Sequence, residues 1–252
     1  MTYGLQEELA SQGNWLFRNR SLLPLAILFV GIAAHLFTLR TSGILFSTVF
    51  PYWHGYEIFC LIISMAGTFI RIYTVGHTPV HTSGRNTVGQ VADSLNTTGI
   101  YSIVRHPLYL GNFLMWFGIS LLTCNGGFII AFILAYWLYY ERIMYAEEDF
   151  LRRKFGVDYL RWAERTPAFI PNFKLFKPSD LPFSWKKVAK KEKNGVFALF
   201  LLFCLFDFIV VWQTGTISAN LILWVMALLS GIAYVLLKYI KKHTHLLDEE
   251  GR

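Results

Sequence analysis

"VFALFLLFCLFDFIVVW", residues 196 to 212, holds a single charged residue, Asp207, among 17 positions. A helix that crosses a bilayer needs about 20 mostly apolar residues, and roughly 17 to 25 are tolerated. The run reaches that range, whereas an apolar run of about 10–14 residues is more typical of a helix buried in a soluble core. This stretch therefore favours a membrane protein.

Five further apolar runs of similar character lie elsewhere in the chain, near residues 21–39, 56–75, 107–123, 126–141 and 219–240. The 252 residues are 54% hydrophobic and only 15% charged, which is too apolar for an ordinary soluble domain. Because open sheet edges are excluded from lipid, all six runs are expected to be helices. The sequence thus predicts an all-α integral membrane protein with about six transmembrane helices. Asn125-Gly126-Gly127 predicts a tight turn that makes the third and fourth helices a hairpin.

The basic residues predict how these helices are oriented. With alternating crossings, 22 of the 23 Lys and Arg residues fall on one side and only Arg40 on the other. Cytoplasmic loops carry the excess of basic residues, so both termini are expected to be cytoplasmic. The polar segments 76–106 and 142–195 share that side, so any chemistry that involves a polar cofactor is expected there. The net charge of +7 follows from these flanks and does not indicate nucleic acid.

Pro178 and Pro182 mark the best internal boundary. We divide the chain into an N-terminal segment with the first helix (1–55), a core with the cytoplasmic cofactor site (56–177), and a basic segment with a two-helix hairpin (178–252). The basic segment is predicted to rest on anionic headgroups of membrane lipids through five lysines: Lys186, Lys187, Lys190, Lys191 and Lys193. Cys60, Cys124 and Cys204 are isolated, which suggests neither a zinc site nor disulfides.

The stretch "TTGIYSIVRHPLYLGN", residues 97 to 112, is the first candidate for chemistry. A residue before proline is pushed out of helical geometry, and proline suits the first turn of a helix, so Pro107 is expected to begin the third span. The free N–H groups of such an end favour an anion, and Arg105 adds further donors. The alternative is that Arg105, His106 and Tyr109 are ordinary interfacial anchors.

The second candidate is "YYERIMYAEEDFLRRKFG", residues 139 to 156. One helix is expected to run from Gly127 to about Phe155 and to project beyond the membrane, which brings Glu147 and Glu148 level with Arg105. Glu148–Arg152 and Asp149–Arg153 have the spacing of ion pairs on a helix surface. Glu147 would then be left to face a ligand, although the two glutamates could exchange these roles.

Together the two stretches resemble the membrane methyltransferases that include isoprenylcysteine carboxyl methyltransferase and phosphatidylethanolamine N-methyltransferase. The resemblance covers roughly residues 60–172. It rests on the pattern T-x-G-x-Y-x-x-x-R-H-P-x-Y-x-G from Thr97 to Gly111, then Glu147-Glu148, Phe155-Gly156, Tyr159, Arg165-x-Pro167 and Ile170-Pro171.

The resemblance implies methyl transfer from S-adenosyl-L-methionine at the cytoplasmic face. It implies that the cofactor is bound by Gln90, Gly99, Tyr101, Arg105, His106, Pro107, Tyr109, Gly111, Glu147 and Glu148. Glu147 is also a candidate catalytic residue, together with Arg142, which lies where the family has an arginine that meets the acceptor. No metal is expected.

The expected acceptor is a lipidic or isoprenoid-like amphiphile with a carboxylate or an amine, entering from the bilayer. Two other functions compete with this one. An NADPH-dependent sterol or steroid reductase would share the R-H-P-x-Y-x-G motif, but that motif usually continues into an acidic residue, where this chain has Asn112. Broken apolar helices and several charges inside the membrane would favour a transporter or a lipid-binding scaffold without chemistry, whereas only Asp207 sits plainly mid-span.

Two polar features lie outside the resemblance. Asp207 sits mid-span in the apolar run, where a carboxylate suggests either a function or a protonated group that is hydrogen-bonded to a neighbouring helix. His77 and His81 are four residues apart, but Pro79 between them makes a helical metal pair improbable. Their segment is therefore expected to be a loop over the cofactor or the acceptor.

Overall fold

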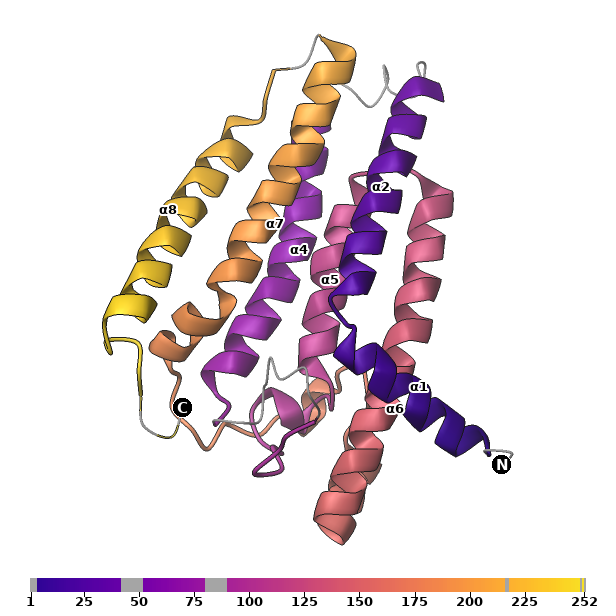
Figure 1. Cartoon of the computed structure of the whole chain (residues 1–252), viewed down its shortest axis with the longest axis vertical. Coiled ribbons are helices and arrows are strands. Elements are labelled where there is room, and N and C mark those ends of the chain that lie inside the picture. The colour runs from indigo at the N-terminus through magenta and orange to yellow at the C-terminus, as the bar shows by residue number, and fades with distance from the viewer. Residues whose placement is uncertain (1–3, 42–51, 80–89, 216–217, 250, 252) are drawn as a thin grey trace.

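The computed structural model describes residues 4–41, 52–79, 90–215, 218–249 and 251, and no strand is found among them. The predicted all-α fold is confirmed (Figure 1). The helices are α1 (Leu5–Arg18), α2 (Leu22–Thr41), α4 (Trp53–Gly76), α5 (Pro107–Leu121), α6 (Gly126–Arg165), α7 (Trp185–Thr214) and α8 (Leu221–His243), with short 3-10 turns at Ile100–Ser102 and Phe173–Leu175.

Five of the described helices, α2, α4, α6, α7 and α8, are long and apolar enough to cross a bilayer, so the chain is a multi-pass membrane protein. The helix predicted between 107 and 123 is present as α5, but it has only 15 residues. At 1.5 Å per residue it measures about 22 Å, short of the ~30 Å hydrocarbon core. The sixth full span therefore stays a prediction.

The chain ends both lie at one end of the bundle, which we call the lower end and which contains Gly76, Pro107 and Trp185 (Figure 1). This placement agrees with an even number of crossings. The assignment of the lower end to the cytoplasm remains a prediction from the basic residues.

The fourth apolar run continues far beyond the membrane region, as expected. Asn125 begins α6 by accepting a hydrogen bond from the Phe128 N–H at 2.9 Å. The helix runs on to Arg165, with one interruption at Gly156, whose φ of 53° only glycine adopts readily. Its final turns project below the other helices (Figure 1).

Small residues let α4 and α5 pack in close contact. A Cβ atom on Gly67 would lie 2.3 Å from the Gly111 carbonyl oxygen, and one on Gly118 would lie 2.1 Å from the Ser64 Oγ. Membrane helices use such residues to bring their backbones together. Gly111 thus contacts α4 and is not among the residues that line the cavity described below, so its expected contact with a ligand stays a prediction.

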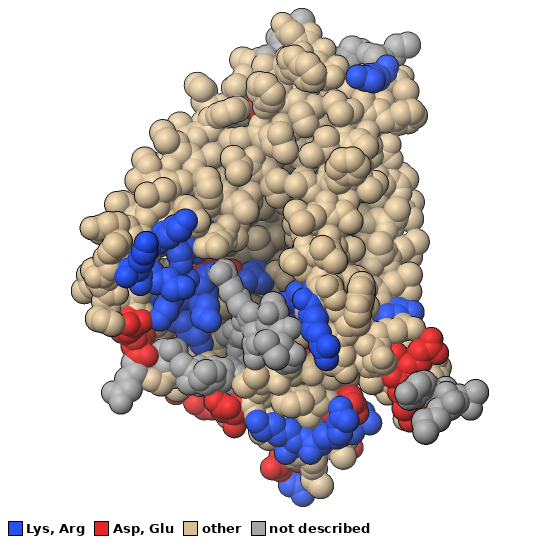
Figure 2. All heavy atoms as spheres, in the orientation of Figure 1, with Lys and Arg blue, Asp and Glu red and all other residues tan. Residues whose placement is uncertain are grey.

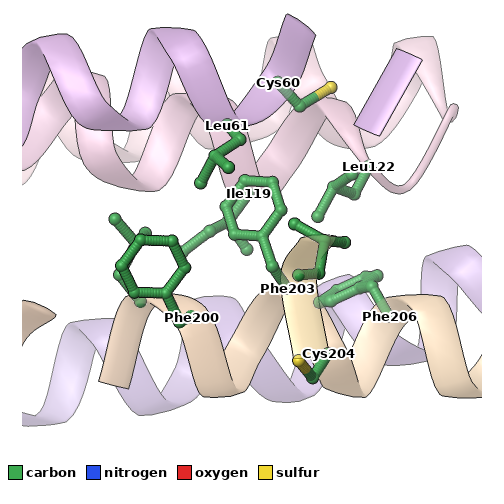
Figure 3. Close-up of a cluster of buried hydrophobic side chains, with 10 residues drawn as sticks. Cys60, Leu61, Ile119, Leu122, Phe200, Phe203, Cys204 and Phe206 are labelled. Atoms are coloured by element: carbon green, nitrogen blue, oxygen red, sulfur yellow. The ribbon is translucent and has the colours of Figure 1, made fainter. Parts of the chain in front are cut away.

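The C-terminal hairpin packs into the same core. Phe200, Phe203 and Phe206 of α7 meet Leu61 of α4 and Leu122, directly after α5, in one buried cluster (Figure 3). Asp207 is the next residue after Phe206. Because α7 is 30 residues long and ends at Thr214, Asp207 lies about two turns from the end of the helix and not, as predicted from the apolar run, in the middle of the span.

On the face shown in Figure 2, charged side chains gather toward the lower end, below a broad band that is almost free of them. The lysines near the start of α7 do not all face lipid headgroups as predicted. Lys187 is buried, with its Nζ donating to the Thr78 Oγ1 at 3.1 Å and to the Pro79 carbonyl at 3.0 Å. Lys191 lines a cavity instead of facing outward. His81 lies outside the described residues, and the His77 ring packs at a tilt against the Tyr73 ring.

The sequence pattern did not predict α1. This helix carries Glu7, Glu8 and Gln12 among apolar residues and lies against α6. A Cβ on Gly13 would lie 2.1 Å from the Arg142 carbonyl oxygen, so the two helices approach closely.

Candidate active site

A cavity of about 330 Å³ opens at the lower end, within the size range of small-molecule sites. Its walls come from α4, α5, α6, the start of α7 and the segment 90–106. Its polar lining residues include Arg20, Arg71, Gln90, Tyr101, Arg105, His106, Tyr109, Asn112, Glu147, Glu148, Lys191 and Glu192.

The backbone around Arg105 is held by the segment that follows α6. The Arg105 N–H donates to the Pro167 carbonyl at 2.9 Å, and the His106 N–H donates to the Ala168 carbonyl at 3.2 Å. His106 has φ −121° and ψ 60°, and α5 begins at Pro107, as the sequence predicted. The Pro167 region, which the resemblance left without a role, thus aligns Arg105 and His106 with α6.

Three charged side chains meet at this point. The Arg105 Nη1 donates to the Glu148 Oε2 at 2.9 Å, and the His106 Nε2 lies 2.8 Å from the Glu148 Oε1. Burial alone would lower the pKa of His106, but the two glutamates outweigh it and raise that pKa above 6.5. For Glu148, burial acts to raise the pKa, while His106 and Arg105 bring it below its ordinary 4.5.

The neighbouring glutamate faces the same cavity. The Tyr109 hydroxyl donates to the Glu147 Oε1 at 2.5 Å, and the His106 Nδ1 lies 3.6 Å from the Glu147 Oε2. The predicted Glu148–Arg152 surface pair is therefore wrong, because Glu148 turns inward to Arg105. Both glutamates reach the cavity, since α5 and α6 lie close enough for Tyr109 and His106 to hold one each. The Asp149–Arg153 pair forms as predicted, at 2.6 Å.

Most of the expected cofactor residues line the cavity, namely Gln90, Tyr101, Arg105, His106, Pro107, Tyr109, Glu147 and Glu148. Gly99 does not line the cavity. It adopts a positive φ of 60°, and its backbone N–H donates to the Lys177 carbonyl. Arg142 also lies outside, on the face of α6 that meets α1, where its Nε donates to the Gln12 Oε1 at 2.9 Å.

An ion pair between α4 and α7 forms another wall, which the sequence reasoning missed. The Arg71 Nε and Nη2 donate to the two Glu192 oxygens at 2.8 and 2.7 Å, and its Nη1 donates to the Asn112 Oδ1 at 2.6 Å. Arg71 lies within the apolar run 56–75, and an ionisable residue inside a membrane helix is by default a functional candidate. In the sequence alone it is one of the basic residues that flank the membrane.

The chemistry of the lining fits S-adenosyl-L-methionine, which combines a sulfonium, an ammonium, a carboxylate and ribose hydroxyls. Glu147 and Glu148 suit the cation and the hydroxyls, while Tyr101 and Tyr109 offer aromatic faces. The Arg105 Nε is buried and has no hydrogen-bond partner among the described residues, so one donor remains for an anionic group.

Known proteins resemble the part of the chain that builds this cavity. The sequence profile described as "Phospholipid methyltransferase" matches residues 56–158. "Protein-S-isoprenylcysteine O-methyltransferase A" of Arabidopsis thaliana is 34% identical over 135 residues, covering 52% of this chain and 66% of that protein. The "Probable protein-S-isoprenylcysteine O-methyltransferase" of Oryza sativa subsp. indica is 31% identical, covering 52% of this chain and 69% of that protein.

A relative with a different name is the "Cobalt-zinc-cadmium resistance protein CzcN" of Cupriavidus metallidurans, 31% identical over 127 residues, covering 50% of this chain and 56% of that protein. The chain thus spans less than two thirds of the length of the Arabidopsis and Cupriavidus relatives. No solved structure matches it significantly.

Proposed function

This chain belongs to the family of membrane methyltransferases that includes the protein-S-isoprenylcysteine O-methyltransferases and the phospholipid methyltransferases, and we propose that it methylates a lipidic acceptor with S-adenosyl-L-methionine. The observation that carries the proposal is the convergence of Arg105, His106, Glu147 and Glu148 on one cavity at the end of a membrane bundle. We further propose that this end faces the cytoplasm, where the positive-inside rule puts its basic residues.

In this proposal the cavity binds the cofactor through the residues that line it. Arg105 directs its unpartnered Nε at the carboxylate, and Glu147 takes the ammonium or the ribose hydroxyls. Glu148 contacts the ligand less directly, because Arg105 and His106 already occupy its two oxygens. Gly99, Gly111 and Arg142 are left out, since they do not contribute to the described lining.

When bound, the cofactor supplies a methyl group on a sulfonium sulfur, which is already a good leaving group. The protein then has to align the acceptor with that methyl group and exclude water, and positioning of this kind can supply much of the acceleration. A carboxylate acceptor needs no base. An amine acceptor must lose a proton, and Glu147 is the carboxylate in the lining with the fewest fixed partners to receive it.

The acceptor class follows from the location of the cavity. It opens at the end of helices that are otherwise coated with apolar side chains, so an amphiphile with a carboxylate or an amine can reach it from the bilayer. The names of the relatives, which refer to O-methylation of isoprenylcysteine, favour an acceptor with a carboxylate over one with an amine.

The test is incubation of the purified protein in lipid vesicles with methyl-labelled S-adenosyl-L-methionine and a membrane lipid extract, followed by mass spectrometry of the organic phase. Label should enter a lipidic species, disappear with Glu147→Gln and persist with Asp149→Asn. NADPH consumption without label transfer would instead support the reductase alternative.

A further inference from the structure

A second polar group lies at the opposite, upper end of the bundle. His54 and Glu57 are on the first turns of α4, and Asp207 is on α7 near its end. One donor atom from each of the three lies within 4.8 Å of the others. The position of His54 is roughly 25 Å along α4 from Arg71 in the cavity wall, counting 1.5 Å per residue.

The two carboxylates are buried in an environment with little positive charge. Glu57 and Asp207 are both 0% exposed. Asp207 accepts hydrogen bonds from the Asn220 backbone N–H and from the Trp224 Nε1 at 2.7 Å. Glu57 accepts one from the Asn220 Nδ2 at 3.0 Å through its Oε2. The ion pairs among the described residues give this group one cationic partner, His54, whose Nδ1 is 3.3 Å from the Glu57 Oε2.

One oxygen in this group lacks any partner. The Glu57 Oε1 is buried without a hydrogen bond from any described residue. Two buried carboxylates can avoid mutual repulsion if one of them takes up a proton, alone or shared, or if both bind a cation; a proton on the Glu57 Oε1 would have no hydrogen-bond acceptor among the described residues. A shared proton requires a hydrogen bond between the carboxyl groups, and the hydrogen bonds of the described residues include none between Glu57 and Asp207. The arrangement therefore favours a cation.

We propose that His54, Glu57 and Asp207 bind a divalent transition-metal ion. One imidazole and two carboxylates are ligands that suit zinc, cobalt or nickel, and their charge balances a dication. Donors 2.0–2.2 Å from a tetrahedral zinc lie about 3.4 Å apart, so modest side-chain rotations bring the present atoms into place. The His54 side chain is 44% exposed, which leaves a route for the ion.

The surrounding residues suit such a site. Asn220 donates its backbone N–H to Asp207 and its side-chain amide to Glu57, so it orients two ligands at once. Asn220 also stands directly before α8. The ion would therefore join α4, α7 and the beginning of α8 at the end remote from the cavity, in a manner that does not depend on methyl transfer.

The experiment uses the full-length, tag-free protein in detergent after treatment with a chelator. Zn²⁺ or Co²⁺ is titrated by calorimetry, with the thermal midpoint and the visible absorption of Co²⁺ as further readouts. We expect saturable 1:1 binding, a raised midpoint and Co²⁺ bands typical of four-coordination. His54→Ala and Glu57→Gln should abolish all three, while His245→Ala at an exposed position and Asp149→Asn at a half-buried position remote from the group should leave them unchanged.

Two results would overturn the proposal. One is equal metal binding by Glu57→Gln and Asp149→Asn, which would mean that ions associate only with surface groups. The other is the outcome that a shared proton predicts. In that case neither metal affects the wild type, and the Glu57→Gln protein is as stable as the wild type. His54→Ala removes a half-exposed side chain, so the test stands even if the Glu57 variant fails to fold.

Discussion

Two adjacent glutamates on one helix have different surroundings, and this difference decides what each contributes. Glu148 is engaged by a guanidinium and an imidazole, whereas Glu147 accepts one tyrosine hydroxyl and is 25% exposed to the cavity. Glu148 therefore helps to hold α6 against the start of α5. Glu147 is the carboxylate that remains for a ligand.

We expect Glu147→Gln to weaken S-adenosyl-L-methionine binding by about 10- to 150-fold, because a charge-assisted contact of about 1.5–3 kcal/mol is lost. Glu148→Gln should weaken binding and also lower the thermal midpoint, since Arg105 and His106 lose their anionic partner. Calorimetric titration and thermal unfolding of both variants separate these effects. Asp149→Asn, at a position outside the cavity lining, is the control, and losses of equal size at 147 and 149 would contradict the site.

The His106–Glu148 pair should make stability depend on pH. The raised pKa of His106 gives stability that is fully present below pH 6.5 and is lost as pH rises through the pKa in the folded protein. The lowered pKa of Glu148 gives stability that is present above pH 4.5 and is lost as pH falls through its folded value. The pair therefore contributes most between pH 4.5 and 6.5.

The measurement is the thermal midpoint of the wild type minus that of His106→Gln, followed from pH 5 to pH 9. The difference should shrink as the pH rises above about 6.5 and His106 loses its proton. His245→Gln, which alters an exposed histidine, should show no such trend. A difference that is constant over the range would mean that folding leaves the pKa of His106 unchanged, and one that grows with pH would mean that His106 is neutral in the folded protein.

At the scale of helices, the contact between α4 and α5 depends on glycine. Gly67→Ala would place a Cβ 2.3 Å from a backbone oxygen that cannot move aside, so we expect a loss of about 1–3 kcal/mol in the free energy of unfolding. Gly55→Ala is the matched control in the same helix, because a Cβ there meets nothing within 4 Å. Denaturation of both variants in detergent tests the contact, and equal stability would argue against it.

The sequence predicted the helices wherever a long apolar run identified them, and it placed Pro107 correctly because proline restricts its own geometry and that of His106. It did not predict α1, because this helix has too few apolar residues to give a clear pattern and packs on α6, a contact that the sequence alone does not reveal. The partner of Arg71 was also beyond reach, since Glu192 lies 121 residues away. Pairing of Glu148 with Arg152 was wrong because a local spacing rule ignores Arg105, which only the tertiary structure brings near.

At the scale of the whole molecule, the orientation in the membrane is the main prediction. A cysteine introduced at Glu164 should be protected from an impermeant reagent added outside intact cells, whereas one at Ser218 should be labelled above the level of the unaltered protein. Both positions are exposed in the structure and lie at opposite ends of the bundle. The reverse labelling pattern would invert the orientation and place the cavity outside.

The short helix α5 has a consequence for the surrounding bilayer. The α5–α6 turn stops below the upper ends of α2 and α7 (Figure 1), and its polar groups are satisfied within the protein, as where the Asn125 Nδ2 donates to the Thr38 Oγ1 at 3.1 Å. Beside this turn the hydrophobic length of the protein is about 8 Å shorter than the thickness of a typical hydrocarbon core. Such hydrophobic mismatch costs a fraction of a kcal/mol per ångström and is relieved where acyl chains are short. We therefore expect the protein to deform its local bilayer and to partition into thinner membranes.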